Sequence, residues 1–279
     1  GFSSPAVTLT GTLSTRIRDV GAGREYTTIQ SAVAAASAGE IVALDPGEYV
    51  EGGQLLLDKN LSLEGHLAED TIYKLGANRP DIADDASCWV LIPAGNEVTI
   101  RGINFHGNGM VTRVSFRIHG RATFENNIFH DHHNRVASNG TAGSLDRGIA
   151  LLIYNDTVVR NNWFREVQRA SIFLQDVDGA GPKDGRAEVL NNTFTGKQAD
   201  VGQYKNAVAL QTGGDLTFTG NKVEDYDQPW AVEPSIIINA WQAHSVITRN
   251  EFGTMNSGGL VFNVGGLNAT HLSVMQYNR

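Results

Sequence analysis

The sequence contains one cysteine, Cys88, and only 7 prolines and 3 methionines among its 279 residues. A single thiol excludes an intramolecular disulfide framework, although it does not decide the cellular compartment. No uninterrupted apolar run approaches the ~20 residues that a membrane-spanning helix needs. The opening residues, GFSSPAVTLTG, have neither the charged nor the apolar region of a signal peptide, which suits a processed chain as well as a cytosolic one.

The formal net charge is −8, which argues against general affinity for nucleic acid and against adhesion to acidic membranes. An anionic substrate would therefore need a local basic patch or a bound cation. With 41% hydrophobic residues and 31 glycines, the chain has the composition of a globular protein and is long enough to bury a large core.

A short phrase recurs along the chain and is clearest at residues 157–164, which read TVVRNNWF. Close copies stand at 122–129, 187–194, 216–223 and 245–252, and a weaker copy stands at 98–105. Such recurrence is typical of a repeat architecture.

Within the phrase, apolar residues alternate with polar ones, as expected of a strand with one solvated face. The positions predicted to point inward are Ile100, Phe124, Val159, Val189, Phe218 and Ile247. A second strand pattern, with an apolar residue on each side of a variable one, follows every copy, for example at 115–119 and 150–154. Two strands per unit of ~21 to 36 residues favour a β-helix coil over leucine-rich or propeller repeats.

Stacked rungs should align equivalent residues in columns along the coil. One predicted column consists of Asn127, Asn162, Asn192, Asn221 and Asn250. We expect these asparagines in a tight bend, where Asn tolerates a left-handed backbone and its amide bonds to the rungs above and below. A second column, at the outward position of the second strand, is apolar and consists of Leu152, Phe173, Ala209, Ile237 and Val261. Such a column is either covered by other segments of the chain or forms a contact between subunits.

Residues 27–30 (TTIQ) have the pattern of a capping box, and Ile29, Val33 and Ala36 would form the apolar stripe of a short helix that ends near Gly39. Strand signals follow at 41–44, 55–57, 61–63 and 88–92, whereas 67–86 reads as polar and irregular. The stretch from Tyr26 to His66, YTTIQSAVAAASAGEIVALDPGEYVEGGQLLLDKNLSLEGH, resembles the start of pectin-lyase-like right-handed parallel β-helix proteins. That group includes pectin esterases and related periplasmic carbohydrate-binding proteins. The resemblance implies a helix that caps one end of the coil and a secreted or periplasmic location.

We therefore predict an all-β chain, a single-stranded right-handed parallel β-helix with a short N-terminal capping helix. One domain would span 1–279, with the lead-in and cap helix at 1–40 and the coils at 41–279. The predicted loop insertions are 130–148, 176–186, 195–206 and 224–234.

Function in a solenoid is expected in the insertions, because the rungs are committed to packing. The longest insertion begins with His130-Asp131-His132-His133-Asn134-Arg135. In register, His106 lies one rung before His130 and Arg165 one rung after it. A polar surface cluster, a transition-metal site of His106, His130 and His132, and an acid–base site acting on a sugar chain all fit this group.

Elimination from a uronate needs a base, a cation that stabilises the enolate and an acid for the leaving oxygen. The candidate catalytic residues are His130, His132, Arg135, Arg147, Arg165, Lys197 and Tyr204. The candidate substrate-binding residues are His106, His133, Arg169, Tyr226 and Trp230.

Three aspartates, Asp176, Asp178 and Asp184, stand in a Gly- and Pro-containing segment and suit calcium, although their spacing differs from an EF-hand. Gln175-Asp176 resembles the Gln-Asp pair of pectin esterases, but the second catalytic aspartate followed by the esterase's apolar strand is missing from the next rung. The characteristic elements of polygalacturonases, pectate lyases and alginate epimerases are also absent from the sequence. Asp131 with Asp146, or Asp176 with Asp178, could serve a glycoside hydrolase.

The residues together favour a secreted or periplasmic carbohydrate-active protein, a polysaccharide lyase that cleaves an acidic, uronate-containing glycan by β-elimination. The sequence leaves the cofactor open, with calcium as the candidate for the aspartate segment and a solvated turn as the other interpretation of it. The alternatives are a non-catalytic glycan-binding or adhesin-type β-helix, in which Leu152, Phe173, Ile237 and Val261 form a homo-oligomer contact, and a glycoside hydrolase with an Asp pair.

Overall fold

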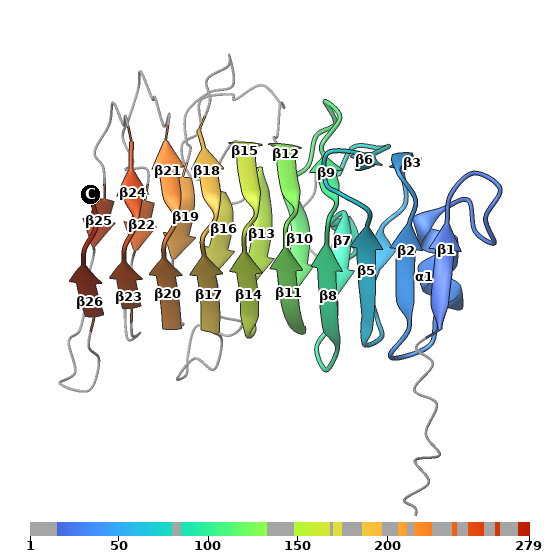
Figure 1. Cartoon of the computed structure of the whole chain (residues 1–279), viewed down its shortest axis with the longest axis horizontal. Helices are drawn as coiled ribbons and strands as arrows, with labels where there is room; N and C mark the ends of the chain where they lie inside the picture. The colour runs from blue at the N-terminus through green and yellow to red at the C-terminus, as the bar shows by residue number, and fades with distance from the viewer. Residues whose placement is uncertain are drawn as a thin grey trace, which may run out of the picture.

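The computed structural model describes residues 16–79, 85–132, 148–167, 170–174, 186–196, 206–210, 215–224, 236–238, 245–253, 260–262 and 273–279. The described chain winds through three long sheets, and all neighbouring strands within each sheet run parallel. Figure 1 shows the rungs stacked along the long axis from β1 to β26. The predicted parallel β-helix is confirmed.

The first sheet, sheet A, holds ten strands. They are β1 (Ile17–Val20), β2 (Ile41–Leu44), β5 (Leu61–Gly65), β8 (Glu97–Arg101), β11 (Arg121–Glu125), β14 (Thr157–Arg160), β17 (Arg186–Leu190), β20 (Asp215–Thr219), β23 (Ser245–Thr248) and β26 (Ser273–Gln276).

The second sheet, sheet B, holds eight strands. They are β3 (Gly47–Glu51), β6 (Thr71–Leu75), β9 (Asn104–His106), β12 (Ile128–His132), β15 (Trp163–Val167), β18 (Thr193–Thr195), β21 (Lys222–Glu224) and β24 (Glu251–Phe252).

The third sheet, sheet C, also holds eight strands. They are β4 (Leu55–Leu56), β7 (Val90–Ile92), β10 (Val114–Ile118), β13 (Ile149–Ile153), β16 (Ala170–Leu174), β19 (Asn206–Leu210), β22 (Ile236–Ile238) and β25 (Leu260–Phe262).

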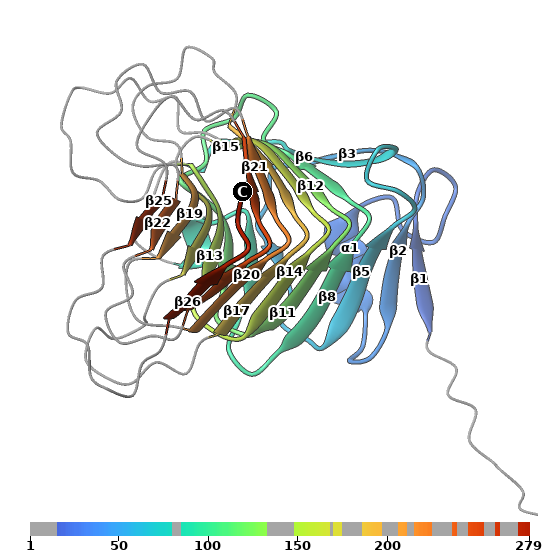
Figure 2. The same ribbon diagram turned by 60° about the vertical axis from the view of Figure 1, so that its left-hand side comes forward.

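Each complete rung contains three strands, one from each sheet, rather than the two that the sequence predicted. The recurring phrase at 157–164 begins in β14 of sheet A and ends in β15 of sheet B. Figure 2 shows how successive strands of the three sheets surround a common interior. The phrase reads as one strand in the sequence because the bend in its middle interrupts the alternation by only two residues.

The bend between sheets A and B is formed by a left-handed residue followed by an asparagine. Asn126, Asn161 and Asn191 have φ of 55°, 57° and 55°, and each precedes a residue of the predicted asparagine column. The prediction therefore placed the left-handed backbone one residue too late. The column residue has its side chain buried instead, as at Asn192, which is 1% exposed.

The buried asparagines bond to one another from rung to rung. Asn192 Nδ2 donates to Asn221 Oδ1 (3.1 Å) and to Val159 O (2.8 Å). Asn192 Oδ1 in turn accepts from Asn162 Nδ2 (3.0 Å) and from the Asn162 backbone amide (2.8 Å). The row extends from Asn127 to Asn278. It satisfies backbone groups that the bend would otherwise bury unpaired.

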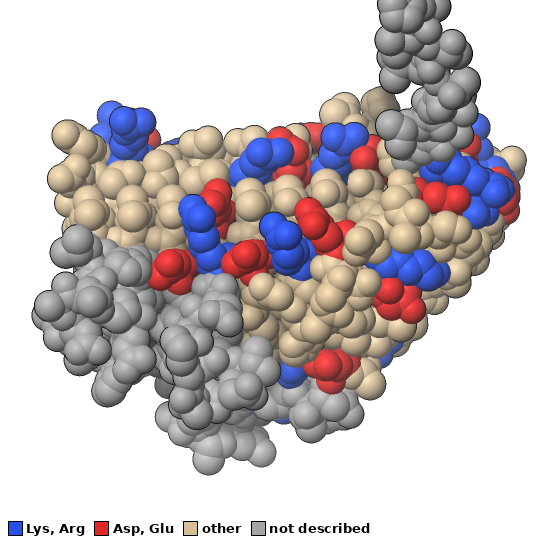
Figure 3. Space-filling model, turned by 90° about the horizontal axis from the view of Figure 1, so that it is seen from below, with Lys and Arg blue, Asp and Glu red and all other residues tan. Residues whose placement is uncertain are grey.

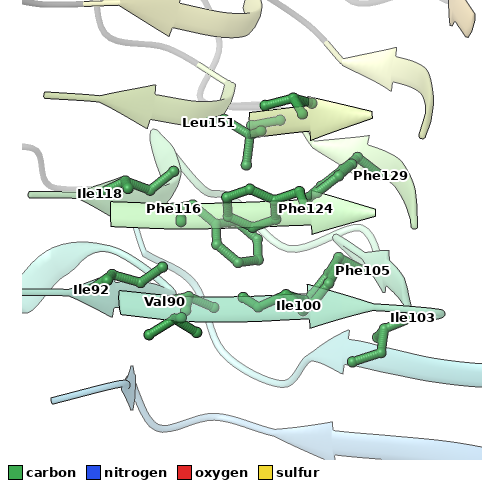
Figure 4. Packing of buried hydrophobic residues seen from close by; sticks show 14 of the residues in the cluster. Val90, Ile92, Ile100, Ile103, Phe105, Phe116, Ile118, Phe124, Phe129 and Leu151 are labelled. Atoms are coloured by element: carbon green, nitrogen blue, oxygen red, sulfur yellow. The ribbon is translucent and has the colours of Figure 1, made fainter. Parts of the chain in front are cut away.

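The core lies between the three sheets and is filled by stacked side chains. All six residues predicted to point inward from sheet A are at most 1% exposed. On sheet B, Phe129 and Phe164 stack in parallel with ring centroids 4.6 Å apart, and Phe164 and Phe194 do so at 5.0 Å. Figure 4 shows side chains from neighbouring rungs meeting in this interior, among them Phe105, Phe116 and Phe124.

One end of the coil is covered by α1 (Ile29–Ala35), which packs against β1, β2 and β4. Its N-cap is Thr28, whose hydroxyl accepts from the Ser31 amide (3.2 Å), one residue later than the TTIQ box predicted. The buried Glu51 carboxylate also accepts from the amides of the first helical turn. The helix ends at Ala35, before the predicted stop near Gly39.

Two further expectations differ from the structure. The segment 67–86, predicted to be irregular, contains β6 and the 3₁₀ turn η1 (Asp85–Ser87), and Tyr73 of β6 is fully buried. In the outward apolar column, Leu152 and Phe173 are only 3% and 2% exposed. At these two rungs the column is therefore covered within the chain, one of the two predicted alternatives. The side chains of Ala209, Ile237 and Val261 lie outside the described residues.

Candidate functional site

A row of basic residues runs along the outer side of sheet B, and three of them, His106, His130 and Arg165, lie in the register that the sequence predicted. Lys74 pairs with His106, His106 with His130, and His130 with Arg165 in the strand register. Thr195 continues the row on the next rung. We call Lys74, His106, His130 and Arg165 the sheet B row.

Three residues of the row contact one another directly. Arg165 Nη2 donates to His130 Nδ1 (3.1 Å), and His130 Nε2 bonds to Glu166 Oε2 (2.8 Å). The rings of His106 and His130 meet edge to face at 4.5 Å. Because a guanidinium only donates and a carboxylate accepts, Nδ1 is the acceptor and Nε2 carries the hydrogen. Both ring nitrogens of His130 are therefore engaged, and neither offers a lone pair to a substrate proton.

His132 does not share the outer side with His130, contrary to the prediction. The intervening Asp131 is left-handed (φ 60°), which breaks the strand alternation and turns His132 into the core. His132 is fully buried, with Nδ1 2.6 Å from Ser115 Oγ and Nε2 2.9 Å from Phe105 O. Burial lowers its pKa to about 4. It is a neutral core residue and is removed from the catalytic candidates.

The inward turn of His132 also removes the predicted metal trio of His106, His130 and His132. In the part of the chain that the structure describes, no group of three or more His, Cys, Asp or Glu side chains is arranged to hold a metal ion. The remaining predicted site residues lie outside the described residues: His133, Arg135, Arg147, Arg169, Asp176, Asp178, Asp184, Lys197, Tyr204, Tyr226 and Trp230, together with Asp146.

A second cluster, which the sequence analysis missed, lies on the outer side of sheet C. Asp85 Oδ1 is 2.8 Å from His119 Nε2 and 3.7 Å from Arg117 Nη1. Arg117 Nη1 donates to the Tyr154 hydroxyl (3.3 Å). The rings of His119 and Tyr154 stack with their centroids 4.5 Å apart and their planes 6° from parallel. We call these four residues the sheet C cluster.

The four residues of the sheet C cluster come from three successive rungs of the coil. Asp85 begins the turn η1, Arg117 belongs to β10, and His119 and Tyr154 directly follow β10 and β13. The His119 amide donates to Ile92 O (2.9 Å), and the Tyr154 amide donates to Ile118 O (2.9 Å). Both ring-bearing residues are therefore held by the ladder of parallel strands.

The charge of Arg117 lies in an otherwise apolar column. In the strand register Arg117 stands between Leu91 and Leu152, and its side chain is 12% exposed. Partial exclusion of water strengthens the field of a guanidinium on any group bound beside it. The His119 side chain, at 21% exposed, remains accessible.

The hydrogen-bond pattern leaves one nitrogen of His119 available. The Asp85 carboxylate accepts from Nε2, so that in the neutral ring Nδ1 carries the lone pair. No partner of Nδ1 is found among the described residues. An imidazole oriented by a carboxylate, beside a cation and a phenol, has the groups for proton abstraction, charge stabilisation and proton donation.

The sequence carried a weak signal for this cluster. Arg117 is the charged member of the variable column in the second strand pattern, and His119 and Tyr154 occupy the polar position that ends it. Asp85 comes from a turn inside the segment 67–86, where no strand pattern aligns it with the others.

Elsewhere the described surface carries charges of both signs side by side, and the face shown in Figure 3 has acidic and basic groups in contact. On sheet A, Arg101 pairs with Glu64 (2.6 Å) and Arg160 with Glu125 (3.0 Å). Exposed pairs of this kind contribute little to stability. No helix among the described residues is long and apolar enough to cross a membrane.

The sequence matches the family model of the right handed beta helix region over residues 81–223, which is more than half of the chain. The chain belongs to this family. No curated protein matches it.

Solved structures share the fold of this β-helix protein at low sequence identity. A pectin methylesterase from carrot superposes with a TM-score of 0.63 and 16% identity, covering 98% of this chain and 84% of the esterase. A pectin methylesterase from Aspergillus niger gives 0.60 and 14%, with 96% and 86% covered. A PL6 family alginate lyase gives 0.52 and 14%, with 99% of this chain but 41% of the lyase covered. These likenesses show that the chain shares the parallel β-helix fold of these enzymes.

Proposed function

We propose that this β-helix protein is a secreted or periplasmic polysaccharide lyase, which cleaves an acidic, uronate-containing glycan by β-elimination at the sheet C cluster. The observation that supports it most is the joint placement of His119, Arg117 and Tyr154, with Asp85 behind the imidazole. Superposition on carbohydrate-active enzymes is consistent with this activity, although fold alone does not determine function.

The three groups divide the chemistry of elimination between them. His119 Nδ1 takes the proton next to the uronate carboxylate, and Asp85 stabilises the imidazolium that forms. Arg117 faces the carboxylate, where negative charge develops in the enolate-like intermediate. The electrons of that intermediate then form a carbon–carbon double bond and expel the glycosidic oxygen.

Tyr154 supplies the proton for the departing oxygen. Its hydroxyl oxygen accepts from Arg117, and a phenolic O–H has a proton that it can transfer to a leaving oxygen. The neighbouring guanidinium favours the phenolate that remains after transfer. The proton taken by His119 is returned to solvent, and the phenol is reprotonated before the next cycle.

The experiment is a turnover assay on a panel of uronate polymers, followed by the absorbance of the unsaturated product, with and without calcium. We expect His119→Ala and Tyr154→Phe each to lower kcat by about a hundredfold or more, the usual scale for a general acid or base. The matched control is His66→Ala, because His66 also bonds to a carboxylate, Asp70, at 2.8 Å but lies between sheets A and B.

Absence of the unsaturated product with every polymer would refute the lyase proposal. Release of reducing sugar without that absorbance would point to hydrolysis instead. Full activity in His119→Ala would remove the site assignment while leaving the class of reaction intact.

A further inference from the structure

Beside the sheet B row, two residues before Arg165 on the same strand, lies an exposed tryptophan that the proposed lyase chemistry does not use. Trp163 of β15 is 38% exposed, although its neighbours in the same column include the 8% exposed Ile128. A large aromatic side chain on a regular strand, unlike one in a loop, keeps a fixed position. If its orientation is also fixed, such a side chain can serve as a rigid surface for a ligand.

Two contacts fix the indole. Trp163 Nε1 donates to Thr195 Oγ1 (3.0 Å) on the following rung. The Arg165 guanidinium lies over the indole ring, with Cζ 4.7 Å from the ring centroid. Because the side chain is already ordered, a ligand that stacks on it loses little conformational entropy of the protein.

Hydrogen-bond donors continue from the indole along the row. Arg165 donates to His130 through Nη2, and its Nε is buried with no partner among the described residues. His106 Nδ1 accepts from the Asn108 amide (2.8 Å), so its hydrogen is on Nε2. Burial and then the neighbouring His130 lower the pKa of His106, which keeps this imidazole neutral as a donor.

The net charge of the row is small, since Lys74 pairs with Glu48 (2.7 Å) and His130 with Glu166 (2.8 Å). Both carboxylates belong to half-exposed side chains, at 56% and 43%. An ordered aromatic plane beside a line of directional donors and acceptors suits a sugar better than it suits a simple anion. Pyranose rings present an apolar face for stacking and hydroxyl groups at their edges.

We infer that Trp163, Arg165, His130 and His106 form a glycan-binding platform on sheet B, separate from the sheet C cluster. One pyranose ring of a polysaccharide chain stacks on Trp163, and oxygens of the adjoining sugars bond to N–H groups of Arg165 and His106, while His130 holds the Arg165 guanidinium in place. The polysaccharide chain runs along the coil axis, because the residues of the row are spaced by one rung, roughly 4.8 Å, in that direction. The platform holds the polymer independently of its cleavage.

The test measures binding of short oligosaccharides by calorimetry in protein carrying His119→Ala, so that no substrate is consumed. One arm uses an oligouronate and the other an uncharged oligoglucan of equal length, because both present the pyranose face. We expect Trp163→Ala to weaken binding about tenfold or more, the cost typical of losing an aromatic anchor. The matched control is Tyr277→Ala, since Tyr277 is an aromatic residue that is 79% exposed on the last rung.

Thermal unfolding of each variant confirms that the coil is intact, and Trp163→Phe provides a second variant that keeps an aromatic plane. Equal affinity of Trp163→Ala and the parent for both sugars overturns the platform, and so does the absence of binding in both arms. Trp163-dependent binding by a wild-type protein without lyase activity would support the platform and refute the proposed function. Lyase activity without Trp163-dependent binding would support the proposed function and refute the platform.

Discussion

His132 is expected to make the stability of the coil depend on pH between 4 and 6.5. Phe105 O can only accept, so His132 Nε2 carries the hydrogen and Nδ1 accepts from the Ser115 hydroxyl. The ring also lies against Trp89 and Phe129. Protonation would place a charge in this aromatic core and would force the Ser115 hydroxyl to change from donor to acceptor.

The magnitude follows from linkage. Burial lowers the pKa of His132 from 6.5 to about 4, whereas the unfolded chain keeps the ordinary value. Between these pH values the unfolded state binds more protons, so stability is full above pH 6.5 and falls as the pH is lowered toward 4. A shift of about 2.5 units at about 1.4 kcal/mol per unit corresponds to about 3 kcal/mol of unfolding free energy.

The assay is urea unfolding followed by circular dichroism at several pH values, on the wild type and on His132→Asn. The variant is less stable at neutral pH but should lose about 3 kcal/mol less than the wild type on acidification. Trp163→Phe is the control, because it changes an exposed side chain that does not titrate and should leave the pH dependence unchanged. Parallel pH profiles for the wild type and His132→Asn would refute the assignment of a buried, neutral imidazole.

Two other predictions concern the coil. Replacing Asn192 by Ala leaves the Val159 carbonyl and the Asn162 amide without their partners and should cost about 2 to 4 kcal/mol of unfolding free energy. Asn278→Ala, at the half-buried end of the row, should cost less, and equal losses at both positions would contradict the role of the row. Cys88 is 1% exposed, and burial raises the pKa of its thiol to about 11. A disulfide reagent should therefore modify it only as fast as the chain unfolds, and rapid modification of the folded protein would show that Cys88 is accessible.

The strand pattern in the sequence predicted the fold well because packing repeats at every rung. Phe124 and Val159 could be placed in the core from alternation alone, and their register, Phe124 opposite Val159, is the observed one. The third strand of each rung was missed, since the bend at residues 161 and 162 joins two strands into what reads as one. Tyr73 was missed because its strand lies in a polar segment with no copy of the phrase.

The sequence predicted part of the sheet B row but not the sheet C cluster. Register brought His106, His130 and Arg165 together correctly, because a column depends only on the spacing between copies. The His132 side chain lies on the core side of sheet B because Asp131 is left-handed. The alternation of polar and apolar residues in the sequence does not reveal this change. The sheet C cluster depends on Asp85, which reaches His119 across 34 positions of sequence, and only the coil geometry brings these residues into contact.

The proposed enzyme cleaves its glycan by β-elimination rather than by hydrolysis. The direct test is mass spectrometry of products formed from a uronate polymer in water enriched in heavy oxygen, with the wild-type protein. Elimination inserts no water, so each cleavage should give one unsaturated end and no labelled oxygen beyond the slow exchange of the new reducing-end hydroxyl. Incorporation of one heavy oxygen atom at each cleaved bond would contradict it and would identify the protein as a hydrolase.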